Sequence, residues 1–220
     1  MATAAFGAVA VAVARRDTAH ADRRLRDRVT ASRGHPARRV AHAVAAPGKW
    51  WAYLPAAVGV AAYVLHANDR SSRGLAGGAR ALVRRLTGAS RRDERSRRAG
   101  AGAVVLASAL AAVLGPVFDR VLPQPPAPPG HPSSRDPVFP SGHAFGPTAM
   151  ALTSAYVLGR ESFGRSGVAL PVALAYPLLS GGGKIVEDRH WTSDVVGGWL
   201  AGLALSAACL AAYERYGRGD

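Results

Sequence analysis

Five long segments without a charged side chain constrain the fold of this chain more than any other feature. They cover residues 50–67, 99–118, 142–159, 166–183 and 195–213, and none contains Asp, Glu, Lys or Arg. A helix of this length spans about 30 Å, the thickness of the hydrocarbon layer of a membrane. We therefore predict an all-α fold, a membrane helical bundle of about five or six helices. The alternative is a soluble all-α protein that buries these helices.

The first 49 residues have a different composition from the rest of the chain. Residues 17–49 are strongly basic, and their apolar positions predict amphipathic or interfacial helices. Those positions are Leu25, Val29, Val40 and Val44. We therefore predict two parts: a basic N-terminal region over residues 1–49 and a transmembrane helical domain over residues 50–220.

The charge of the chain indicates anionic partners. There are 28 Lys and Arg against 14 Asp and Glu, which gives a net charge of +14. The basic stretches lack interleaved aromatic residues, so contact with lipid headgroups or phosphorylated molecules is favoured and no nucleic acid is expected. Cys209 is the single cysteine, which excludes an intramolecular disulfide and a cysteine-based metal site.

Two connecting stretches carry strong turn signals. Residues 122–140 contain eight prolines and predict a loop. The glycines at 181–183 predict the end of a helical segment and a close approach of the backbone to a ligand. A further basic stretch at 69–98 predicts a short amphipathic helix.

Two short motifs stand at the mouths of apolar segments. Pro140-Ser141-Gly142-His143 opens the segment 142–159, and His190-Trp191-Thr192-Ser193-Asp194 precedes the segment 195–213. If 142–159 and 166–183 form an antiparallel hairpin, both motifs lie at the same face of the membrane. The sequence therefore predicts that His143 and His190 converge.

Each motif has a chemical interpretation and a structural one. Asp194 follows His190 by one helical turn, so it can fix the tautomer of the imidazole and leave the other ring nitrogen free to attack phosphorus. Thr192, Ser193 and Asp194 also suit a helix N-terminus. Ser141, Gly142 and His143 fit an anion site at a helix N-terminus with a proton donor. They also fit a serine cap beside a solvated histidine.

Together the motifs resemble the type 2 phosphatidic acid phosphatase superfamily, which includes membrane lipid phosphatases, bacterial acid phosphatases and vanadium haloperoxidases. The family pattern has three parts: Lys, six residues, Arg-Pro; then Pro-Ser-Gly-His; then Ser-Arg, five residues, His, three residues, Asp. The resemblance covers residues 99–213. Residues 140–143 match the second part in full, and His190 and Asp194 match the His and Asp of the third.

The resemblance implies a role for each matching residue. His190 is implied as the nucleophile, Asp194 as the carboxylate that orients it, and His143 as the general acid. Phosphate oxygens are implied to bind Ser141, Gly142, Arg120 and Lys184. No metal and no cofactor is implied.

The first part of the pattern is degenerate in this chain. Arg120 replaces the family's lysine, and Ala127, before Pro128, replaces its first arginine. In the third part Lys184 replaces arginine and cannot offer the same bidentate fork. Arg135 or Arg189 is a candidate replacement for the arginine missing at Ala127.

The expected function is a multi-pass cell-membrane phosphatase with its site at the extracytoplasmic side. It would remove a phosphate monoester or diphosphate group from a lipid through a phosphohistidine. Candidate substrates are phosphatidate, phosphatidylglycerol phosphate and polyprenyl diphosphate. The alternatives are a catalytically impaired membrane protein that binds phospholipid headgroups, and a vanadate-dependent haloperoxidase-like enzyme. Counting helices places the basic residues 17–49 outside, against the positive-inside bias.

Overall fold

The computed structural model describes residues 1–32, 34–66, 89–161 and 166–217. Within these ranges all regular elements are helices. In chain order they are α1 (Ala2–Ala14), α2 (Ala19–Val29), α3 (Pro36–Ala45), the 3-10 turn η1 (Ala46–Gly48), α4 (Trp50–His66), α7 (Ala89–Val121), α8 (Gly142–Arg160), α9 (Ser166–Val186) and α10 (Thr192–Gly217).

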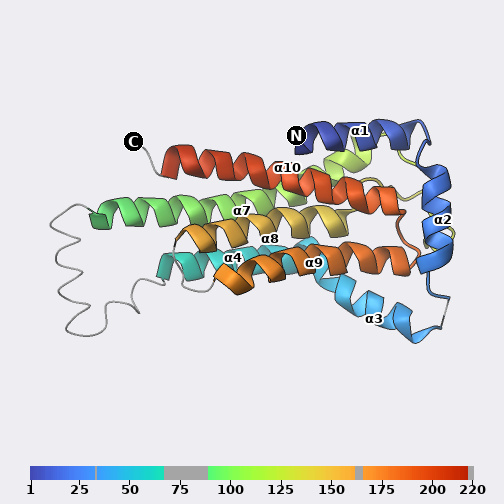
Figure 1. Cartoon of the computed structure of the whole chain (residues 1–220), viewed down its shortest axis with the longest axis horizontal. Coiled ribbons are helices and arrows are strands. Elements are labelled where there is room, and N and C mark those ends of the chain that lie inside the picture. Colours follow the sequence, from blue (N-terminus) through green and yellow to red (C-terminus); the bar gives the residue numbers. More distant parts are fainter. Residues whose placement is uncertain (33, 67–88, 162–165, 218–220) are drawn as a thin grey trace.

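The long helices α4, α7, α8, α9 and α10 lie side by side along the length of the molecule (Figure 1). Helix α8 is in contact with each of the other four, so it forms the centre of the bundle. Each of the five uncharged segments lies mainly in one of these helices, which confirms the predicted all-α membrane bundle. Most of the short helix predicted within 69–98 lies outside the described residues.

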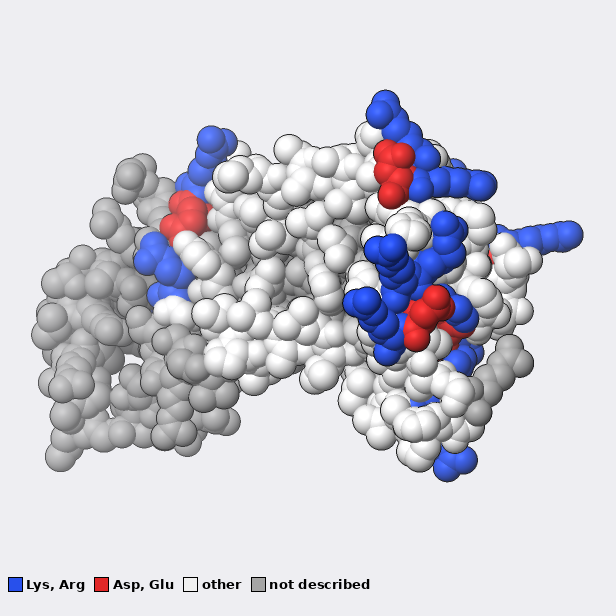
Figure 2. Space-filling model, turned by 45° about the vertical axis from the view of Figure 1, so that its right-hand side comes forward, with Lys and Arg blue, Asp and Glu red and all other residues white. Residues whose placement is uncertain are grey.

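The packing of the bundle is that of a membrane protein. Small side chains fill the interior, where Ala57, Ala107 and Ala149 have no exposed surface. Larger apolar side chains point outward, and Leu106 and Leu174 are 49% and 48% exposed. Small residues let helices approach closely in lipid, where outward-facing leucines cost nothing. Among the described residues, three helices are long and apolar enough to cross a membrane: Glu94–Val121, Ala169–Val186 and Thr192–Gly217. Figure 2 shows the charges gathered towards the ends, with an uncharged middle.

Helix α8 carries several hydroxyl side chains, and its central position satisfies them. The hydroxyl of Thr148 donates to the carbonyl of Ala144 at 2.7 Å. The hydroxyl of Thr153 donates to the carbonyl of Ala149 at 2.7 Å and is 3.0 Å from Ser206 Oγ on α10. These groups are bonded inside the bundle, so a helix of moderate polarity can be buried at its centre.

Two glycines of α10 allow its first turns to lie directly against the start of α8. A Cβ at Gly198 would lie 2.6 Å from the carbonyl oxygen of Ser141, and one at Gly202 would lie 2.7 Å from the carbonyl oxygen of Phe145. Any larger residue would force the helices apart at these points. This close approach brings the two sequence motifs together.

The predicted helix end at the glycine run 181–183 is wrong, because α9 continues to Val186. A Cβ at Gly183 would lie 2.7 Å from the carbonyl oxygen of Ala41, so this glycine lets α3 pack on α9. The run therefore serves the contact between two helices.

The N-terminal helices surround the end of the bundle where α8 and α10 begin. Helix α1 lies along α10, α3 packs on α9, and α2 crosses the end (Figure 1). The helices predicted over 17–49 are present as α2 and α3, and two of their apolar positions face outward: Leu25 is 40% and Val40 is 62% exposed. Helix α2 instead buries a carboxylate, Asp22. The division of the chain at residue 50 stays a prediction.

Candidate active site

The two sequence motifs meet at one end of the bundle. The ring centroids of His143, at the start of α8, and His190, just before α10, are 6.4 Å apart. The backbone N–H of Ser141 donates to the carbonyl of Asp194 at 2.9 Å, which joins the two motifs directly. The antiparallel arrangement of α8 and α9 thus brings the histidines together from chain segments 47 residues apart.

The imidazole of His190 is oriented by a backbone carbonyl and a carboxylate. Its Nδ1 lies 2.9 Å from the carbonyl oxygen of Val138 and 3.6 Å from Asp194 Oδ2. A carbonyl oxygen only accepts hydrogen bonds, so Nδ1 carries the proton and Nε2 keeps its lone pair. The tautomer expected from the sequence is therefore present, with Val138 as the nearer acceptor.

Asp194 also has the capping role that its position in the sequence suggested. Its Oδ2 accepts a hydrogen bond of 2.8 Å from the backbone N–H of Trp191, the residue that precedes α10. A carboxylate at the third helical position that bonds back to the cap stabilises the first turn. The chemical and the structural interpretation of Asp194 are thus compatible in one geometry.

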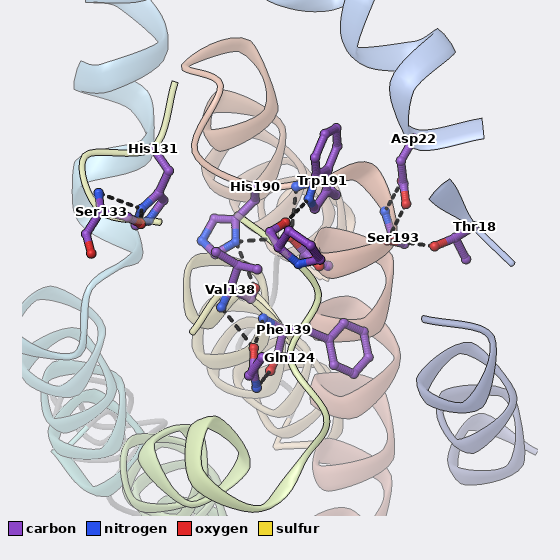
Figure 3. Close-up of polar contacts among 12 residues, drawn as sticks. Thr18, Asp22, Gln124, His131, Ser133, Val138, Phe139, His190, Trp191 and Ser193 are labelled. Atoms are coloured by element: carbon purple, nitrogen blue, oxygen red, sulfur yellow. Dashed lines mark hydrogen bonds and ion pairs between the residues drawn. The ribbon is translucent and has the colours of Figure 1, made fainter. Parts of the chain in front are cut away.

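The acceptor for His190 is itself held by a residue of the proline-rich loop. The side-chain oxygen of Gln124 accepts from the N–H groups of Val138 and Phe139, at 3.0 and 2.9 Å. Its amide donates to the carbonyl of Phe139 at 2.8 Å (Figure 3). The indole N–H of Trp191 donates to Pro126 at 2.7 Å. The loop predicted over 122–140 is confirmed, and its backbone is fixed against the His190 segment.

Helix α2 fixes the same segment from the other side. The buried Asp22 accepts hydrogen bonds from the N–H and the hydroxyl of Ser193, at 2.9 and 2.7 Å. Arg26 forms a bidentate ion pair with Asp188, with two N···O distances of 2.7 Å. These bonds raise the pKa of the Arg26 guanidinium. Asp188 has a φ of 59°, an unfavourable backbone region for this residue, which the ion pair helps to hold.

Lys184 reaches the site end of the bundle but is engaged by a carboxylate. Its Nζ lies 2.8 Å from Glu187 Oε2, and both side chains are almost fully buried. The other oxygen of Glu187 lies 2.9 Å from Nδ1 of His42 on α3. The positive charge expected at the phosphate is therefore present and partly neutralised by Glu187.

The other basic candidates differ in their surroundings. The exposed guanidinium of Arg120 donates a hydrogen bond of 3.2 Å to the carbonyl of Pro116, which lies on the same helix. Arg135 is exposed. Arg189 is partly buried beside His190, and its Nε has no hydrogen-bond partner among the described residues. Arg189 and Arg135 both stay candidates to replace the arginine missing at Ala127, and of the two Arg189 is the more buried.

The His143 side of the site contains polar atoms that the described protein leaves unbonded. Buried atoms without a partner include Ser141 Oγ and His143 Nε2, together with Arg189 Nε and Asp194 Oδ1 on the opposite side. Ser141 does not cap α8 with its side chain. A Cβ at Gly142 would meet no atom within 4 Å. Because buried polar groups are normally bonded, this clustering indicates a site for a ligand rich in oxygen atoms.

Some of these positioning residues were not foreseen from the sequence. Asp22, Arg26, Gln124 and the carbonyl of Val138 belong to neither motif. The only signals were a carboxylate within a basic stretch and a lone amide among prolines.

In the described part of the chain, no group of three or more His, Cys, Asp or Glu side chains is arranged to hold a metal ion.

Comparison with known proteins places this site in context. Residues 99–218 match the family model described as PAP2 superfamily. The fold resembles the crystal structure of a transmembrane PAP2 type phosphatidylglycerolphosphate phosphatase from Bacillus subtilis, with a TM-score of 0.72 and 19% sequence identity. The likeness covers 100% of this chain and 97% of the other. Among curated protein sequences, none matches this chain significantly.

Proposed function

This chain belongs to the PAP2 superfamily, and we propose that it is an integral-membrane phosphatase that removes a phosphate monoester or diphosphate group from a lipid. The observation that carries the proposal is the pair His143 and His190, with ring centroids 6.4 Å apart and unbonded buried polar atoms around them. The structural relative is a transmembrane phosphatidylglycerolphosphate phosphatase, which supports a phosphorylated lipid as the substrate.

The first step is attack on phosphorus by Nε2 of His190. Because Nδ1–H donates to Val138, the free lone pair is on Nε2. The N–P bond forms as the bond from phosphorus to the lipid oxygen breaks, and the ring becomes positively charged. The carbonyl of Val138 and the carboxylate of Asp194 stabilise this charge. His143 gives its proton to the departing lipid alkoxide.

The second step reverses these roles with water. His143, now neutral, takes a proton from a water molecule as that water attacks the phosphohistidine. The N–P bond breaks, inorganic phosphate leaves, and His190 recovers its starting form. Each half-reaction moves one proton through His143, so one imidazole serves as acid and then as base.

The phosphate oxygens are proposed to bind Ser141 Oγ, the N–H groups at Gly142 and the start of α8, and Arg189. In this arrangement Arg189 supplies the guanidinium that is missing at Ala127. Lys184 contributes its charge from its pair with Glu187. Arg120 is also proposed to bind a phosphate oxygen, because it occupies the position of the lysine in the family pattern. Its guanidinium would first have to break its hydrogen bond to the carbonyl of Pro116.

We place the site at the extracytoplasmic face, by analogy with the family topology. The basic helices α2 and α3 then lie outside together with the site, as the helix count predicts. Their departure from the positive-inside bias has a physical reason, because several of their polar side chains bond to carboxylates and hydroxyls of the catalytic loop. A membrane-impermeant reagent should label a cysteine introduced at the exposed Arg135 in intact cells.

The direct test is phosphate release by the purified full chain in detergent. Phosphatidate, phosphatidylglycerol phosphate and a polyprenyl diphosphate are the substrates, and His190→Ala is the control. We expect the wild type to act on at least one of them and His190→Ala to lose at least about a thousandfold in rate, because the nucleophile is gone. Equal release by wild type and a folded His190→Ala would refute the proposal.

A further inference from the structure

A second basic cavity lies beside the candidate active site. It has a volume of about 310 Å³ and opens between α3 and the loop that precedes His190. Its side chains include the N-cap residue His35 and Arg38, Arg39 and His42 from α3, and Glu187 and Arg189 from the α9–α10 connection. None of these residues belongs to the two sequence motifs.

The cavity carries excess positive charge. Its one carboxylate, Glu187, is already bonded to Lys184 and to His42, at 2.8 and 2.9 Å. Among the described residues, no ion pair with a carboxylate is found for Arg38, Arg39 or Arg189. Three guanidinium groups around one cavity favour a ligand with several anionic oxygens, because each can donate two parallel hydrogen bonds.

His35 adds a further donor. Its Nδ1 accepts a hydrogen bond of 3.1 Å from the N–H of Ala37 and caps α3. The ring proton of neutral His35 is therefore on Nε2. This nitrogen is left to donate to a ligand in the cavity.

The chain segments that line the cavity also contribute to the candidate active site. Arg189 lines it, is adjacent to His190 in the chain, and has a buried Nε without a partner. The turn that follows α3 touches the other histidine, since a Cβ at Gly48 would lie 3.2 Å from Cδ2 of His143. Helix α3 is anchored there by its packing against Gly183. Residues 187–190 and the end of α3 thus border both the cavity and the candidate active site.

We infer that this cavity binds a second phosphate group of the same lipid substrate, the one that is not attacked. The inference rests on the proposed phosphatase function and narrows it. The protein is then expected to prefer lipids with two phosphate groups over lipids with one. The two groups can form a diphosphate, or one can be a phosphodiester and the other a terminal monoester. The N-terminal helix α3 is then part of substrate recognition.

Binding by a protein that cannot turn over isolates this site from catalysis. His190→Ala in lipid nanodiscs is titrated with phosphatidylglycerol phosphate, with a polyprenyl diphosphate and with phosphatidate. We expect at least one of the two lipids with two phosphates to bind about tenfold more tightly than phosphatidate. Adding Arg38→Gln and Arg39→Gln should abolish this preference. The lipid that loses affinity identifies whether a diester or a diphosphate fills the cavity.

A matched control removes two exposed arginines outside the cavity, Arg24→Gln and Arg28→Gln on α2. It lowers the charge by the same amount and should leave the preference intact. A preference unchanged by Arg38→Gln and Arg39→Gln, or lost equally in both double variants, would overturn the inference. So would equal binding of all three lipids or binding of free inorganic phosphate alone. If the wild type released no phosphate, the proposed phosphatase function would be refuted. The lipid preference would still be measurable, because it is determined from binding.

Discussion

The two halves of the candidate site differ in how far the protein satisfies its own polar groups. In the His190 half, contacts from α2, α3 and the proline-rich loop fix the segment 184–194. In the His143 half, Ser141 Oγ and His143 Nε2 are buried without a partner in the described part of the chain. The His190 half also has two such atoms, Arg189 Nε and Asp194 Oδ1, but its other polar groups hold the segment in place. The protein therefore builds the proposed nucleophile into a rigid setting and leaves the opposite half for the ligand to complete.

This contrast predicts how substitutions in each half should affect stability and activity. Changes in the fixed half should lower stability and activity together, because they remove bonds that the empty protein already has. Changes in the open half should lower activity alone. Thermal unfolding in detergent and phosphate release together separate the two behaviours.

Apart from the loss of the nucleophile His190 itself, the largest effect on rate is expected in the open half. His143→Ala should reduce kcat by about a hundredfold to ten-thousandfold, because it removes the proton donor for the leaving oxygen. Its Tm should stay close to that of the wild type, because the lost Nε2 has no hydrogen-bond partner. A large fall in Tm would mean that His143 has a structural role and would weaken the contrast.

The largest effect on stability is expected in the fixed half. Lys184→Met leaves Glu187 buried with only His42 beside it, and should cost about 3 kcal/mol in the free energy of unfolding. The double variant Lys184→Met with Glu187→Gln should recover most of that stability. If Lys184 also attracts the phosphate, activity stays low in the double variant. Recovery of both stability and activity would assign Lys184 to structure alone.

A smaller cost is expected where α2 bonds to the start of α10. Asp22→Ala removes two hydrogen bonds to Ser193 and should destabilise the protein by about 1–3 kcal/mol. Activity should fall as well, since Ser193 adjoins Asp194. Asp22→Asn, which keeps one acceptor oxygen, should be milder in both measurements. An Asp22→Ala protein with unchanged activity would show that α2 stabilises the fold without positioning the site.

The smallest effect is expected for Ser141→Ala. Its hydroxyl has no partner in the described protein, so the change in stability should be within about 0.5 kcal/mol. One lost hydrogen bond to phosphate should lower kcat/KM about fivefold, corresponding to about 1 kcal/mol. A drop in Tm without a change in kcat/KM would reverse the assignment of Ser141 to the open half.

Much of the fold was predictable because its signals are local. The absence of charge over 18–20 residues predicted the five bundle helices, and the hairpin of α8 and α9 predicted that His143 and His190 meet. The pair of Lys184 and Glu187 was not predicted, because α9 was expected to end before Lys184. The glycines at 181–183 led to the wrong prediction that the helix ends there. Glycine often ends helices, but it also allows two helices to pack closely.

The supports of the His190 segment were not predictable because they join distant parts of the chain. Asp22 and Ser193 are 171 positions apart, and Arg26 and Asp188 are 162 apart. The apolar pattern of residues 17–49 indicated amphipathic helices but gave no sign that α2 buries a carboxylate, Asp22. Such polar contacts follow from the three-dimensional arrangement and leave no periodic signal in one sequence.

The most direct test of the central claim is to trap the phosphorylated enzyme and locate the phosphoryl group. The full chain is mixed with a lipid substrate labelled on its terminal phosphate, quenched in alkali, and examined for phosphohistidine by mass spectrometry and phosphorus NMR. We predict a phosphoryl group on Nε2 of His190, because Nδ1 is occupied by its hydrogen bond to Val138. The label should be absent from His190→Ala. Phosphorylation of Nδ1, labelling of another residue, or turnover without any phosphohistidine would contradict the account.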